Sequence, residues 1–180
     1  GMSGLTYPVV DTMQETCFDL VGKKIACPAE GEALRGQDAQ YSHGAASYTH
    51  RSDGTVLDNN THLVWQQTPE NDRFQDALDY CSNLELGGRT DWRVPSIKEL
   101  YSLADNRGEL LKPKEGKPTP YIDTSFFDFY YPEGRMAFAG QYWSSTLYVK
   151  GPVQNGRNQA AFGFNFADGH IKAYGTGLDF

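Results

Sequence analysis

The segment Asp91-Trp92-Arg93 places a carboxylate, an indole ring and a guanidinium on three consecutive residues. An arginine in this setting is suited to hold an anionic ligand, and a tryptophan beside it offers a face for stacking. The same pattern also fits a structural ion pair at the entry to a helix, with the ring in the core. We therefore take Asp91 and Arg93 as candidate ligand-binding residues and keep the ion pair as the alternative.

Tyrosines in the irregular, aromatic stretch 121–158 form a second set of candidates. A tyrosine ring combines apolar area with a hydroxyl, so on a loop it serves either to bind a ligand or to anchor the loop itself. The candidates are Tyr130, Tyr131, Tyr142 and Tyr148. Trp65 and Trp143 fall within expected strands, and we expect both rings to lie in the core.

Familiar catalytic and metal-binding motifs are absent from the sequence. The four histidines show no metal-ligand spacing, and no His-Glu-x-x-His, Gly-x-Ser-x-Gly or phosphate-loop pattern occurs. Cys81 lies on the apolar face of an expected helix, where a thiol is buried rather than reactive. We therefore expect no catalytic residue, no metal site and no cofactor, and a binding module more than an enzyme.

Cys17 and Cys27 bracket a short segment with Gly22-Lys23 near its middle. A hairpin turning there would bring the two sulfurs together, and closing so small a loop contributes roughly 2–3 kcal/mol. A zinc site would need four suitably spaced ligands, so a disulfide is favoured, with two free thiols as the alternative. A disulfide implies export. Gly1-Met2 indicates an engineered start, so we expect the natural protein to carry a leader that this sequence lacks.

The composition limits the classes of function. Sixteen Lys and Arg against 23 Asp and Glu give a net charge of −7 over 180 residues, so nucleic acid is not an expected partner. No apolar run approaches the ~18 residues of a membrane helix, and we expect no membrane insertion. The 19 Gly, 9 Pro and 21 Tyr and Phe (11 and 10) are typical of a loop-rich domain built on short strands.

The chain divides into an N-terminal arm, 1–46, and a single globular unit, 47–180. Asn59-Asn60 is expected to form a two-residue hairpin loop that sets Val56 opposite Leu63, with Trp65 on the same face. Asp168-Gly169 is expected to do the same, setting Phe166 opposite Ile171. The strand between them is expected over Tyr142-Trp143-Ser144-Ser145-Thr146.

Two helices are expected between these hairpins. Asp72 and Gln75 fit a capping box, followed by Phe74, Ala77, Leu78 and Cys81 at helical spacing and ended by Gly87-Gly88. Ser96 and Glu99 fit a second capping box. The inward stripe of that helix is Ile97, Leu100, Leu103 and Ala104, and Asp105 to Gly108 ends it.

These landmarks, in this order, resemble one family: the bacterial domain typified by the C-terminal domain of the Legionella collagen-like adhesin. The resemblance covers about residues 47 to 174. Its motifs are Asp53-Gly54-Thr55-Val56, Leu63-Val64-Trp65-Gln66, Ala77-Leu78-Asp79-Tyr80-Cys81, Leu86-Gly87-Gly88, Asp91-Trp92-Arg93-Val94-Pro95, Lys98-Glu99-Leu100, Ile122 to Phe127, Tyr142-Trp143-Ser144-Ser145 and Phe164 to Gly169. The Cys pair with the segment Gly36 to Tyr41 is similar to an arm that often precedes this domain in exported proteins.

The resemblance implies an α+β, C-type-lectin-like fold, with two helices on small antiparallel sheets and long irregular loops. It implies an extracytoplasmic, non-catalytic binding or adhesion module whose partner is a glycan or a surface protein. The adhesin's domain is associated with sulfated polysaccharides and with trimers, so a homo-oligomer is one expectation. Two alternatives stay open: an enzyme of the formylglycine-generating branch, suggested by the segment from Arg93 to Glu99, and a structural or oligomerisation module.

The sequence departs from the resemblance at two points. In lectin-like folds a cysteine in the last strand bridges to the first helix, where Cys81 would be its partner, but residues 1–180 contain no such cysteine. We therefore expect either that the partner has been lost by truncation or that Cys81 is a free thiol. The triplets that supply calcium-ligand oxygens in calcium-dependent lectins are also missing, so calcium is not supported. The charge of −7 opposes an anionic ligand unless Lys112, Lys114 and Lys117 gather locally.

Overall fold

The computed structural model describes residues 10–41, 44–70, 73–110, 116–131, 140–149 and 159–177. Within these ranges it contains two α-helices, one 3-10 helix and three small sheets whose strands all pair antiparallel. The α+β class expected from the sequence is confirmed. No helix in the described ranges is long and apolar enough to cross a membrane.

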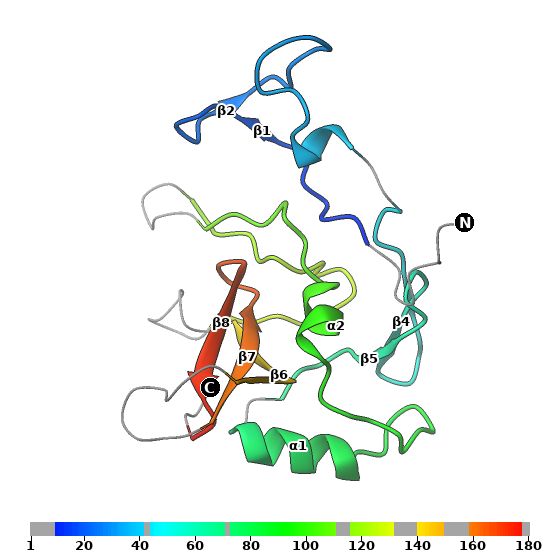
Figure 1. Cartoon of the computed structure of the whole chain (residues 1–180). Helices are drawn as coiled ribbons and strands as arrows, with labels where there is room; N and C mark the ends of the chain where they lie inside the picture. The colour runs from blue at the N-terminus through cyan, green and yellow to red at the C-terminus, as the bar shows by residue number, and fades with distance from the viewer. Residues whose placement is uncertain are drawn as a thin grey trace, which may run out of the picture.

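The N-terminal arm forms a disulfide-closed hairpin. Strands β1 (Cys17–Phe18) and β2 (Lys24–Ile25) pair around a turn in which Gly22 adopts a φ of 80°, a conformation that glycine tolerates without strain. Cys17 and Cys27 are joined, as expected, and Cys17 is buried. Figure 1 shows this hairpin at the end of the molecule away from the first α-helix.

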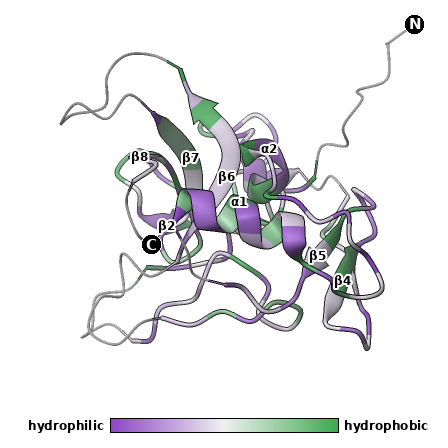
Figure 2. Cartoon of the chain, turned by 90° about the horizontal axis from the view of Figure 1, so that it is seen from below, coloured by the Kyte–Doolittle hydropathy of each residue, from purple (hydrophilic) through white to green (hydrophobic). Residues whose placement is uncertain are grey.

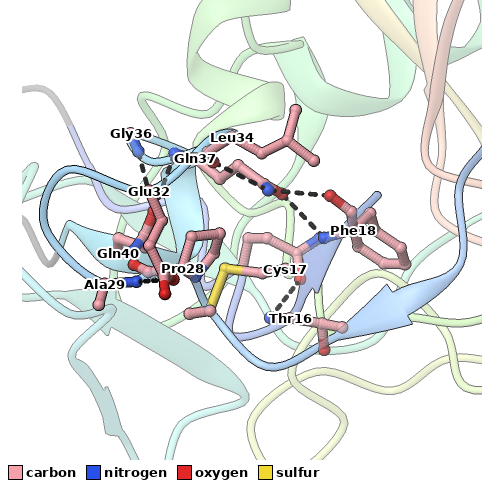
Figure 3. Close-up of a disulfide and its surroundings, with 12 residues drawn as sticks. Thr16, Cys17, Phe18, Pro28, Ala29, Glu32, Leu34, Gly36, Gln37 and Gln40 are labelled. Atoms are coloured by element: carbon pink, nitrogen blue, oxygen red, sulfur yellow. Dashed lines mark hydrogen bonds between the residues drawn. A yellow bond between two sulfur atoms is a disulfide. The ribbon is translucent and has the colours of Figure 1, made fainter. Parts of the chain in front are cut away.

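Two glutamines hold the disulfide loop in shape. The Gln37 side chain accepts the backbone N–H of Phe18 at 2.8 Å and donates to the Phe18 carbonyl at 2.9 Å, so it pairs with β1 as a neighbouring strand would (Figure 3). Gln40, in the 3-10 helix η1 (Asp38–Gln40), donates to the carbonyl of Pro28 at 2.6 Å. The polar segment 36–41 thus stabilises the hairpin through side-chain hydrogen bonds to its backbone.

A three-stranded sheet follows, in the order β3 (Tyr48–His50), β4 (Thr55–Asp58) and β5 (Val64–Gln66). Val56 lies opposite Trp65, so the expected pairing with Leu63 is wrong by two residues. The loop spans 59–62 because the Asp58 carboxylate accepts the backbone N–H of Asn60 at 2.9 Å and widens the turn. A slip of two preserves the face, so Val56 and Trp65 still share one side.

The third sheet has the order β6 (Gln141–Tyr148), β7 (Ala160–Asn165) and β8 (His170–Gly175). Here Phe164, not Phe166, lies opposite Ile171. The Asn165 side chain accepts a hydrogen bond from the N–H of Ala167 at 2.8 Å, so the turn begins directly after Asn165 and Phe166 lies in the loop rather than in the strand. Because β8 is an edge strand, Ile171 remains 45% exposed although its partner Phe164 is fully buried.

Helix α1 (Phe74–Asn83) buries the stripe that its spacing predicts. Phe74 is buried, Ala77, Leu78 and Cys81 are half-buried, and the intervening polar residues are exposed, so hydrophilic and hydrophobic positions alternate along the helix (Figure 2). The expected capping box is wrong: Asp72 lies outside the described residues, the N-cap is Arg73, and the Gln75 side chain donates to Asp79 instead.

Helix α2 (Ile97–Tyr101) begins as expected, with Ser96 and Glu99 forming a reciprocal capping box. It is shorter than expected, but turns after it still bury Leu103 and Ala104. Leu100 and Leu103 pack between Val56 of β4 and Phe164 of β7. In Figure 1, α2 accordingly lies between the two larger sheets.

The two helices cover opposite faces of the β6–β8 sheet. Phe164 packs with α2, whereas Ala161, which points to the other face of the same strand, packs with Phe74 and Trp143 near α1. The outer edge of β6 therefore lies between the helices, and a pocket lies beside the start of this strand.

Candidate functional site

A pocket of about 400 Å³ lies beside the start of β6. Such a volume is within the range of small-molecule sites. Strand β5, the inner side of α1, the connection 89–95, the start of α2 and the segment 127–129 supply its other walls. All three tryptophans of the chain, Trp65, Trp92 and Trp143, line it.

Helix α1 is held at the pocket by rings and by one hydrogen bond. Phe74 meets Trp143 edge to face, with ring centroids 5.3 Å apart. At the other side of the helix, the Gln66 side chain of β5 donates to the Tyr80 hydroxyl at 2.8 Å. These contacts join β5, α1 and β6 around the pocket.

The connection before α2 closes the rim by binding the edge of β6. The N–H of Ser145 donates to the Pro95 carbonyl at 2.8 Å, and the N–H of Ile97 donates to the Thr146 hydroxyl at 2.9 Å. The Trp92 indole N–H donates to the Leu86 carbonyl at 3.2 Å. Together these bonds fix Trp92 and its neighbours against the strand edge.

Glycine is required at the turn preceding this connection. Gly87 has a φ of 61°, and a Cβ there would lie 2.8 Å from the Asp53 carboxylate and 2.9 Å from the Thr55 methyl group. Gly87 thus lets the turn pack against β4, which positions the segment that carries Asp91 and Arg93.

Asp91 and Arg93 do not pair with each other. Asp91 accepts two hydrogen bonds from Arg89, at 2.9 and 2.7 Å, and both side chains are largely exposed. Arg93 donates to both oxygens of Glu99, at 2.8 and 2.6 Å. The expected ion pair between Asp91 and Arg93 is therefore wrong, and each residue pairs with a different partner.

The Arg93–Glu99 pair is the stronger of the two electrostatically. Glu99 is 14% exposed and also accepts the N–H of Ser96 at 2.8 Å. The Arg93 guanidinium is the main cause that lowers the pKa of Glu99 to about 2. The carboxylate therefore stays ionised and keeps Arg93 engaged across the physiological range. The capping box predicted from the sequence is therefore only part of the role of Glu99.

Two hydrogen-bond donors in residues that line the pocket lack a partner. The indole N–H of Trp65 and the side-chain amide nitrogen (Nε2) of Gln141 are shielded from solvent, and neither donates to any part of the chain that the structure describes. Gln141 itself is only 7% exposed and uses its oxygen to accept the Tyr174 hydroxyl at 2.9 Å. Buried donors of this kind are uncommon and each calls for an explanation.

The sequence-predicted candidates separate into two groups. Asp91, Arg93 and Tyr142 line the pocket, and burial raises the pKa of Tyr142 to about 12. The other three tyrosines are not among its lining residues. Tyr130 is 69% exposed, Tyr131 packs edge to face on Phe129, and Tyr148 packs on Phe162 at the far end of β6.

Sequence reasoning missed Trp65, Tyr80 and Gln141 as pocket residues. Trp143 is buried as expected, whereas Trp65 is only half-buried and lines the pocket. One signal was available for Gln141: it lies two residues before Trp143, so in a strand it shares the inward face of that ring. A polar residue at such a position requires a partner.

Cys81 lines the pocket as the free cysteine of the chain and is half-buried rather than buried. Burial raises its pKa, which disfavours the thiolate needed for nucleophilic attack. The described residues contain no group of three or more His, Cys, Asp or Glu that could hold a metal ion. Of the three loop lysines, Lys112 and Lys114 lie outside the described residues and Lys117 is exposed.

Comparison with known proteins gives one match. A family model described as the Lcl C-terminal domain matches residues 54–178, more than half of the chain. Neither the curated proteins nor the solved structures contain a match. The matched range includes every residue that lines the pocket.

Proposed function

This chain belongs to the Lcl C-terminal domain family, and from that premise we propose that it is a non-catalytic binding module that acts outside the bacterial cytoplasm. The family is adhesin-associated, which supports a role in attachment to a glycan or a surface protein. The Cys17–Cys27 disulfide supports an oxidising compartment. The two helices on small antiparallel sheets fit a C-type-lectin-like arrangement, with 1–46 as an arm on the unit 47–180.

The observation that carries this proposal is the pocket beside β6. It combines aromatic walls with a few buried polar groups, which is the composition of a site that binds a small molecule. The raised pKa of Cys81 speaks against an enzyme that depends on a thiolate.

A screen on a glycan array and on purified surface proteins tests the proposal, using the wild type and two matched variants. Tyr80→Ala removes a ring from the pocket wall, and Tyr130→Ala removes a ring that is exposed away from it. We expect a ligand that the wild type and Tyr130→Ala retain and that a folded Tyr80→Ala variant loses. Binding that depends on Tyr130 instead would place the site elsewhere, and no binding to either collection would refute the proposal.

A further inference from the structure

The unpartnered donors restrict what the pocket can accept. The Trp65 indole N–H and the Gln141 amide nitrogen belong to residues of β5 and β6 that both line the pocket, and both atoms are shielded from solvent. A buried N–H without an acceptor lowers the stability of the fold, because it has lost its bond to water and gained none in exchange. A ligand that brings acceptor oxygens would recover that free energy on binding. The donors thus select for a ligand rich in hydroxyl, ether or carbonyl oxygens.

The charges at the pocket argue against an anion. Both arginines among the described lining residues are already held in two-bond forks, Arg89 by Asp91 and Arg93 by Glu99. Glu70 and Asp128 also line the pocket, so these six side chains sum to two positive and four negative charges, or −2. To bind either arginine, a sulfate or carboxylate ligand would have to displace the carboxylate from a two-bond ion pair. The net negative charge of the lining residues would also repel it.

The walls favour a ligand with flat, weakly polar faces. Trp65, Trp92 and Trp143 surround the pocket from three elements far apart in sequence. Indole faces carry partial negative charge, which attracts the C–H groups on the faces of a pyranose ring. A pyranose therefore matches the pocket twice: its faces suit the rings and its oxygens suit the donors.

We propose that the pocket binds a neutral pyranose sugar, whose oxygens accept hydrogen bonds from Trp65 and Gln141 while its faces contact the tryptophans. This inference rests on the proposed binding function and specifies its ligand class. The ion pairs Arg89–Asp91 and Arg93–Glu99 then shape the rim and do not contact the sugar as free charges. Calcium has no part in this mode of binding.

The test is a titration of the full chain with neutral methyl glycosides of glucose, galactose, mannose and N-acetylglucosamine, each against its O-sulfated counterpart. Tryptophan emission is the readout, confirmed by calorimetry, because every tryptophan lines the pocket. Trp65→Phe removes an unpartnered N–H and keeps a ring. Tyr130→Phe is the matched control, because it also removes one hydrogen-bonding group and keeps a ring, but on an exposed residue that does not line the pocket.

We expect at least one neutral glycoside to bind in the millimolar range or tighter, its sulfated counterpart to bind no better, and Trp65→Phe to weaken binding about tenfold. Tyr130→Phe should stay within about threefold of the wild type, since Tyr130 does not line the pocket. Tighter binding of the sulfated sugar, or equal effects of the two variants, would overturn the neutral-sugar assignment. If no glycoside binds while the surface-protein screen gives a ligand that Tyr80→Ala loses, the sugar assignment fails and the binding function stands.

Discussion

Arg93 and Glu99 form a two-bond fork, with N–O distances of 2.8 and 2.6 Å, and the same carboxylate accepts the backbone N–H of Ser96 at 2.8 Å. One side chain thus starts α2 and anchors the segment that carries Trp92 along the pocket. The fold of the helix entry and the shape of the rim depend on the same carboxylate. This coupling makes Glu99 a sensitive point for both stability and binding.

Glu99→Gln should lower the free energy of unfolding by about 1–2 kcal/mol at neutral pH, because it removes a charge-assisted fork on a mostly buried carboxylate. Its matched control, Asp91→Asn, disrupts a similar fork that is largely exposed and should have no measurable effect. Urea denaturation of both variants measures the difference. Equal losses of unfolding free energy in the two variants would show that burial does not make the Arg93–Glu99 pair more stabilising than the Arg89–Asp91 pair.

The lowered pKa of Glu99 predicts a pH dependence. Because the folded-state pKa of about 2 lies below the ordinary value of 4.5, the pair contributes its full stability above pH 4.5. That contribution should fall as the pH drops from 4.5 towards 2, where the carboxylate becomes protonated even in the folded state. Denaturation midpoints across this range should decline less steeply for Glu99→Gln than for the wild type. If the midpoints of the wild type and of Glu99→Gln fell equally with pH, the pH dependence could not be assigned to Glu99.

Gly163→Ala should destabilise the sheet at the pocket. A Cβ there would lie 2.5 Å from the Gln141 amide nitrogen and 2.6 Å from the Tyr142 carbonyl oxygen, one of them a backbone atom. Overpacking of this kind costs about 1–3 kcal/mol, and it should also displace Gln141 and weaken ligand binding. Gly175→Ala in β8, where no atom lies within 4 Å of the added Cβ, is the control and should leave thermal stability nearly unchanged.

Cys81 should react slowly with thiol reagents at pH 8. Burial raises its pKa above the ordinary value of 9.0, so the thiolate fraction is smaller than in a free cysteine. Cys17 and Cys27 are bonded to each other, so alkylation followed by mass spectrometry reports Cys81 alone. The rate should rise in urea and fall when a ligand fills the pocket. A rate that exceeds that of a free cysteine would reopen the enzyme alternative.

Gln37→Ala should loosen the disulfide hairpin without affecting the pocket. The Gln37 side chain bonds both backbone groups of Phe18, so its loss should speed hydrogen exchange at the Phe18 amide by about tenfold. Gln75→Ala, which removes a side-chain bond on the exposed side of α1, is the control and should leave that amide unchanged. Unchanged exchange in Gln37→Ala would mean that the disulfide alone orders the strand.

The local elements of this protein could be predicted from sequence because local chemistry determines them. The capping box of Ser96 and Glu99, the inward stripe of α1 and the Cys17–Cys27 pairing each depend on residues close together in the chain. Hairpin registers were wrong by two residues, because Asp58 and Asn165 bond the turn backbone and widen the loops. Each strand still turns the expected side chains to the same face, because side chains alternate with a period of two and a register shift of two residues leaves that alternation unchanged.

The pocket was decided by tertiary structure. Its walls come from β5, α1, the connection 89–95 and β6, and no spacing in the sequence indicates that Trp65, Trp92 and Trp143 line one pocket. The partners of Asp91 and Arg93 are close in sequence, two and six residues away, yet only the folded connection shows that Asp91 pairs with Arg89 and Arg93 with Glu99. The sequence by itself determined the class, the helices and the disulfide. The assembly of distant segments determined which donors remained unpartnered, because burial and pairing exist only after the chain has packed.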